Sequence, residues 1–127
     1  MKTLTKADPA SALMAESWTL FNNGHELAAV ATARMLFESV LRNALDEAWR
    51  GSAKAGATKL LHKATLTGRI SRRLRRHLDT TCSHLSEVIH GRQMTVAQIE
   101  SLLTTTESGL RSLIAELRQP AVEVQHA

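Results

Sequence analysis

Hydrophobic residues recur at steps of three and four along most of the chain, which is the spacing of amphipathic helices. Asp8-Pro9 is typical of a helix start and the polar run at 22–24 (NNG) of a helix end, so a first helix is expected over about residues 9–22. A second helix is predicted over about residues 25–49. Its apolar surface is wider than one stripe, which favours a central position in the fold.

The second half of the chain predicts further helices, separated by small residues and glycine. The expected elements are a flexible linker at 51–57, a short helix at about 58–66, a basic helix at about 69–90 and a final helix ended by Pro120. Gly91 supplies the permissive backbone expected just after a helix C-terminus, and Thr95 is a typical N-cap.

The final helix carries a heptad seam. Its members are Val96, Ile99, Leu103, Thr106, Leu110, Leu113 and Leu117. This seam is expected to pack on the core or on a second subunit. Because a single domain rarely needs two wide apolar faces, the seam and the second helix together predict a homodimer.

Composition supports an all-α fold. The chain has two Trp, two Phe and no Tyr, so its core must be built from aliphatic side chains at helical spacing. We expect a four- to five-helix up-and-down bundle. It would form a single domain over residues 1–119, with a disordered tail at 120–127.

Positive charge is concentrated in one region. Residues 50–92 hold ten basic and two acidic side chains, whereas the rest of the chain holds six basic and ten acidic ones. A cluster of cations attracts polyanions, so nucleic acid, with RNA favoured, is the leading candidate partner, and a partner protein is the alternative.

The basic helix carries the predicted phosphate-binding residues. They are Arg69, Arg72, Arg73, Arg76 and, just beyond the helix, Arg92. With no aromatic platform among them, affinity is expected to depend on salt and little on sequence. A solvated face paired with acids from elsewhere is the alternative interpretation. The helix lacks the Trp or Phe of an interfacial helix, and no apolar run is long enough to span a bilayer, so no membrane association is expected.

His84, Glu87 and His90 follow one another at steps of three near the end of the basic helix. The spacing lacks the i,i+4 histidine pair that a metal site would prefer, so no metal and no cofactor is expected. Acid-base use of His90 is chemically sounder, because imidazole can take a proton from a ribose hydroxyl. The lone Cys82 and the lack of a secretory leader predict a cytoplasmic protein without disulfides.

The order of these segments resembles the HEPN superfamily, in particular its DUF4145-like branch. The resemblance covers about residues 25–118 and is carried by ARMLFESVLRNALDEA, KLLHKAT, a break at TG, RISRRLRRHLDTTCSHLSEVIHG and the closing amphipathic helix. It includes the placement of Arg34 and Glu38 and the terminal Ile89-His90-Gly91. It implies a dimeric helical bundle of a kind common among metal-independent ribonucleases of toxin-antitoxin and antiphage systems.

The resemblance implies an active-site motif that this chain carries only in part. His90 matches the motif histidine, but the family's arginine would fall near 83–85, where the chain has Ser, His and Leu. Two hypotheses follow. One is a noncatalytic HEPN-like dimer that binds nucleic acid or a partner protein, as an accessory component of a defence or toxin-antitoxin system. The other is a divergent metal-independent ribonuclease using His84, His90 and Glu87.

Overall fold

The fold is all-helical, as the hydrophobic spacing predicts. The computed structural model describes residues 8–45 and 56–119. Within these residues the elements are α1 (Pro9–Asn22), α2 (Glu26–Ala44), α4 (Ala57–Leu66), α5 (Arg72–Ile89) and α6 (Val96–Arg118), with no strand among them. The end of the second helix predicted at Trp49, most of the expected linker and the predicted tail at 120–127 lie outside the described residues.

Side-chain caps set where these helices begin. The Asp8 carboxylate accepts a 3.1 Å hydrogen bond from the Ala10 amide, and Thr95 forms a capping box with Gln98. Both caps confirm the predicted helix starts. The basic helix instead begins at Arg72, three residues later than predicted, because the chain turns at Gly68 (φ 75°) and Ser71 then caps α5.

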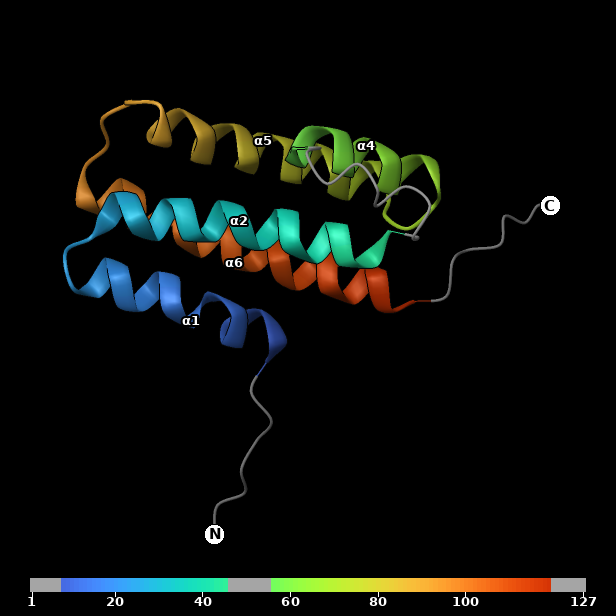
Figure 1. Ribbon diagram of the computed structural model, residues 1–127, viewed down its shortest axis with the longest axis horizontal. Helices are drawn as coiled ribbons and strands as arrows, with labels where there is room; N and C mark the ends of the chain where they lie inside the picture. The colour runs from blue at the N-terminus through green and yellow to red at the C-terminus, as the bar shows by residue number, and fades with distance from the viewer. Residues whose placement is uncertain (1–7, 46–55, 120–127) are drawn as a thin grey trace, which may run out of the picture.

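Helix α2 occupies the centre of the bundle and packs against α1, α4, α5 and α6 (Figure 1). Its inward face is fully buried and consists of Ala29, Val30, Ala33, Phe37 and Leu41. The predicted central position is therefore confirmed. On the outward side of the same helix, Leu27 and Met35 remain exposed by 58% and 64%.

The heptad seam of α6 packs on the core of its own chain. Five of its members, Ile99, Leu103, Thr106, Leu110 and Leu113, are buried. Val96 departs from the prediction, since it is 57% exposed at the start of the helix. The buried seam is thus not available to a second subunit. None of the described helices is both long and apolar enough to cross a lipid bilayer.

Candidate nucleic-acid interface and neighbouring grooves

Arg72, Arg73 and Arg76 lie on the exposed surface of the first turns of α5. None of the three makes an ion pair or a hydrogen bond through its side chain to another described residue. The buried face of the same helix consists of Leu74, Leu78, Thr81, Cys82, Leu85 and Val88. The helix therefore separates its apolar side from its arginines as the sequence pattern predicts.

Arg69 departs from its predicted place among these phosphate-binding residues. Its guanidinium donates hydrogen bonds of 2.6 Å to the Ala44 carbonyl and 3.4 Å to the Leu117 carbonyl. These carbonyls lie in the last turns of α2 and α6, where backbone acceptors lack partners within the helix. Arg69 precedes α5 and is half-buried, so its donors serve the two helix ends.

Arg75 also differs from the exposed arginines, because it is engaged within the protein. Its Nε lies 3.3 Å from the Asp79 carboxylate, and one of its terminal nitrogens lies 3.1 Å from Nδ1 of His62 on α4. The contact with His62 joins α4 to α5. It lies beside the surface formed by Arg72, Arg73 and Arg76, called the basic surface below. Arg92, the last of the predicted phosphate-binding residues, pairs with Glu87 at 2.5 Å and is half-exposed. It is not an unpaired cation.

A groove of about 650 Å³ lies where the start of α4 meets the middle of α2 and the second half of α5. Its lining residues are Arg34, Gly56, Ala57, Thr58, Lys59, Asp79, Cys82, Ser83, Ser86, Glu87 and His90. Thus the structure brings the predicted pair Glu87 and His90 into one groove. It also adds two cations, Arg34 and Lys59, that sequence reasoning did not assign to a site.

His90 caps the C-terminus of α5, and Gly91 turns the chain away with φ at 111°. Nδ1 of His90 lies 2.8 Å from the Ser86 carbonyl oxygen. Because a carbonyl oxygen only accepts, the proton of a neutral His90 ring lies on Nδ1 and its Nε2 keeps a free lone pair. The ring is exposed and is held with that acceptor available.

The acids of the groove are each matched by a cation beside it. Asp79 pairs with Arg75 and Glu87 pairs with Arg92. Arg34 lies 3.7 Å from Glu38, whereas Lys59 has no side-chain partner among the described residues. The groove consequently favours an anion. To assign Arg34 to this groove from the sequence, one would have to know that α2 packs against α5 near His90. No local sequence pattern contains that information.

His84 lies apart from His90, against the prediction that the two share one side. Six residues separate them, which places their side chains about 120° apart around the helix axis. His84 instead lines a second groove of about 360 Å³ between α5 and α6. The other lining residues of this groove are His77, Thr80, Thr81, Met94, Gln98, Ser101, Leu102 and Thr105.

Cys82 lies at the floor of the His90 groove but is 8% exposed. Burial, with smaller contributions from Asp79 and Glu38, raises the pKa of its thiol to about 12. The thiol therefore stays protonated and is a poor nucleophile. No three His, Cys, Asp or Glu side chains within residues 8–45 and 56–119 gather closely enough to hold a metal ion.

Comparison with known proteins returned no match. No family model matches the sequence, and no curated protein or solved structure is significantly similar to the chain.

Proposed function

We propose that this chain is a noncatalytic, HEPN-like helical dimer that binds the phosphate backbone of nucleic acid, with RNA as the favoured partner. The observation that carries the proposal is the position of Arg72, Arg73 and Arg76. All three are exposed and unpaired among the described residues, and all three lie in the first turns of one helix. Planar guanidinium groups fit phosphate oxygens bidentately.

Helix electrostatics support a role for an external anion at this place. The N-terminus of a helix carries a partial positive charge, so arginines there are mildly destabilising, whereas α5 has no acid in its first turn. Glu116 of α6 accepts hydrogen bonds from the Ser71 amide and hydroxyl at the N-cap of this helix. A bound phosphate would relieve the repulsion among the arginines and meet the positive end of the helix.

The proposed dimer would use the outward side of α2. Leu27 and Met35 are exposed there, whereas the heptad seam of α6 is buried within its own chain. Sedimentation equilibrium at tens of micromolar should give a dimer, and a Met35→Glu variant should be monomeric with an unchanged helical signal. A monomeric wild type would contradict this part of the proposal. The HEPN resemblance would place such a dimer in a defence or toxin-antitoxin system.

Phosphate binding can be tested with a triple variant and a charge-matched control. R72A/R73A/R76A removes three positive charges from the surface of α5, and A12E/A15E/T19E adds three negative charges on exposed positions of α1. Binding of labelled RNA is measured by fluorescence anisotropy across salt concentrations. The arginine variant should lose most of its affinity, and the slope of log K against log salt should fall by about 2 for single strands.

The control variant should keep the wild-type slope, since its added charges lie on α1, which packs against α2 and α6 and carries none of these arginines. Circular dichroism should show the same helical content for all three proteins. Equal affinity of wild type and R72A/R73A/R76A would mean that these arginines form a solvated surface without a phosphate partner.

A second candidate function rests on Arg34. The groove that holds His90 and Glu87 also holds this arginine, supplied by α2. In a metal-independent ribonuclease, Nε2 of His90 would take the ribose hydroxyl proton and Arg34 would stabilise charge on the phosphate. Chelator-resistant RNA cleavage that is lost in His90→Ala and Arg34→Ala, but kept in the exposed control His25→Ala, would establish it. No cleavage above background by wild type would favour the noncatalytic function.

A further inference from the structure

The groove between α5 and α6 continues a line of side chains that begins at the basic surface. Arg73, His77, Thr80 and His84 follow one another at steps of four, three and four, so they lie on one side of α5. The last three line the groove, and all four are exposed. A polymer bound at Arg73 would therefore meet this groove next along the helix.

Close contact between the two helices fixes one end of the groove. Gly109 of α6 lies under His77, because a Cβ built on it would stand 3.5 Å from Nε2 of His77 and 2.9 Å from a methyl group of Leu78. The absence of a side chain at Gly109 lets the imidazole rest near the α6 backbone. His84 lies seven residues further along α5, about 10 Å away at the rise of an α-helix.

The lining of this groove combines polar groups with a larger apolar surface, and it carries no formal charge when the imidazoles are neutral. Hydroxyl groups come from both helices, the Gln98 amide from α6, and apolar surface from Met94 and Leu102. The hydroxyl groups of Ser101 and Thr105 make no hydrogen bond to another described residue, so both can donate to and accept from a ligand. The side-chain carbonyl of Gln98 accepts from the Thr95 amide, and its NH₂ group has no partner among the described residues.

This chemistry suits a nucleobase better than a phosphate. Histidine rings are among the side chains on which unpaired bases stack, and hydroxyl and amide groups read base edges. A phosphate would find no fixed cation inside the groove and would find three arginines beside it. The volume of about 360 Å³ is at the small end of ligand sites, which favours a single base with part of its sugar.

We infer that the α5–α6 groove accepts an unpaired base of single-stranded nucleic acid, stacked on His77 or His84, while the neighbouring phosphates lie on Arg73 and Arg76. The inference rests on the proposed phosphate binding and adds its substrate class. A base held within a duplex cannot enter the groove, so the protein discriminates single strands from duplexes.

The test compares a 12-nucleotide single-stranded RNA with its duplex at pH 8, where histidine side chains in general carry little charge. His77→Ala and His84→Ala should each weaken single-strand binding by about fivefold or more and leave duplex binding unchanged. His84→Phe keeps a stacking surface and should retain most of the affinity. His25→Ala is the matched control, since its exposed imidazole lies at the start of α2.

The outcomes separate the inference from the function on which it rests. Single-strand affinity unchanged in His77→Ala and His84→Ala, with the arginine variant still impaired, would overturn the base site and leave phosphate binding intact. An equal loss of affinity for single-stranded and duplex RNA would also overturn the base site, because the histidines would then contact the sugar-phosphate backbone. If wild type binds neither nucleic acid, the proposed function fails first.

Discussion

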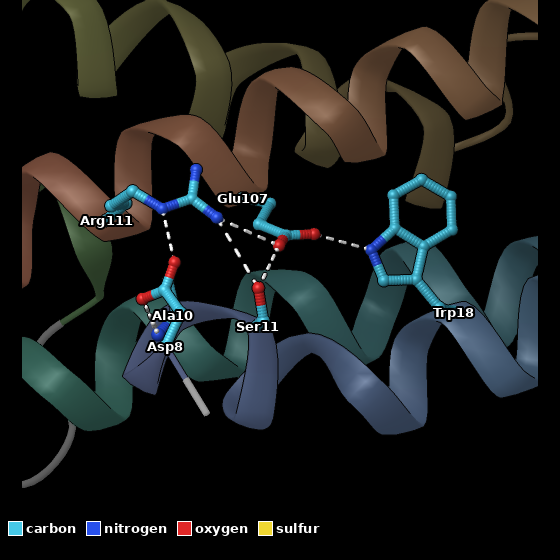
Figure 2. A network of polar contacts seen from close by, with 6 residues as sticks. All are labelled: Asp8, Ala10, Ser11, Trp18, Glu107 and Arg111. Carbon is cyan, nitrogen blue, oxygen red and sulfur yellow. Dashed lines mark hydrogen bonds and ion pairs between the residues drawn. The ribbon is translucent and has the colours of Figure 1, made fainter. Parts of the chain in front are cut away.

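Trp18 of α1 donates a 2.7 Å hydrogen bond from its indole nitrogen to the carboxylate of Glu107 on α6. Figure 2 shows the same carboxylate receiving hydrogen bonds from Ser11 and Arg111, while Arg111 reaches on to Asp8. The side chain of Glu107 is 18% exposed, so its charge is partly removed from water. Three side chains from two helices, Ser11, Trp18 and Arg111, thus depend on one carboxylate, which ties α1 to the bundle.

Glu107→Ala should lower the free energy of unfolding by about 2 kcal/mol, because charge-assisted hydrogen bonds are lost and the indole nitrogen is left without its acceptor. Urea unfolding followed by circular dichroism measures the change. Glu100→Ala is the control on the same helix, at an exposed position, and should shift stability little. Equal stability of both variants would show that α1 is held by apolar packing alone.

Stability should also depend on pH through Glu107. Partial burial raises the pKa of this carboxyl, but hydrogen bonds from Ser11 and Trp18 and the charge of Arg111 outweigh it, so the net pKa is lowered from 4.5. A depressed pKa stabilises the fold above the unfolded value, and this stabilisation is lost as pH falls through the folded value. The urea midpoint of wild type should therefore decline below about pH 4.5, and Glu107→Gln should flatten part of that decline.

Cys82 should resist thiol reagents in the folded protein. Burial raises the pKa of its thiol to about 12, so little thiolate exists at pH 8, and the side chain is covered by its neighbours. Labelling with a disulfide-exchange reagent should be at least about 100-fold slower in buffer than in urea, since reaction must await opening of the fold. Rapid, complete labelling of the native protein would contradict this placement.

Local sequence signals predicted the helix boundaries better than the site. Asp8, Thr95 and Gly91 act within a few residues of their own position, so each could be recognised without knowledge of the fold. The two grooves depend instead on which helices cross. Arg34 and His90 line one groove only because α2 packs against α5, and the spacing of residues along either helix does not contain that packing.

The histidines show the same limit within a single helix. Steps of three carry side chains gradually around an axis, so His84 and His90 are close in sequence but line separate grooves. The pattern of apolar and polar positions along the sequence could predict that both histidines are exposed. Which neighbour each one meets depends on α4 on one side of α5 and α6 on the other.

Arg69 provides the sharpest contrast between a structural and a binding arginine. Its charged donors meet the Ala44 and Leu117 carbonyls at the ends of α2 and α6, where a cation is also favoured by the helix dipoles. Arg69→Ala should lower the free energy of unfolding by about 1–3 kcal/mol, because half-buried carbonyls lose their partner. Arg69→Lys should recover part of this loss, since one ammonium group cannot span both helix ends as a planar guanidinium does.

The variant matched to Arg69→Ala is Arg73→Ala. Arg73 lies four residues later, in the first turn of α5, and is exposed and unpaired among the described residues. This variant should leave unfolding unchanged within about 0.5 kcal/mol, as exposed substitutions usually do, and weaken RNA binding. Arg69→Ala should lower the free energy of unfolding and leave RNA binding unchanged. Its RNA binding is measured under conditions in which the variant is still folded. If Arg69→Ala weakened RNA binding as much as Arg73→Ala while leaving stability intact, its guanidinium would belong to the phosphate-binding surface after all, and the two carbonyl contacts would be incidental to the fold.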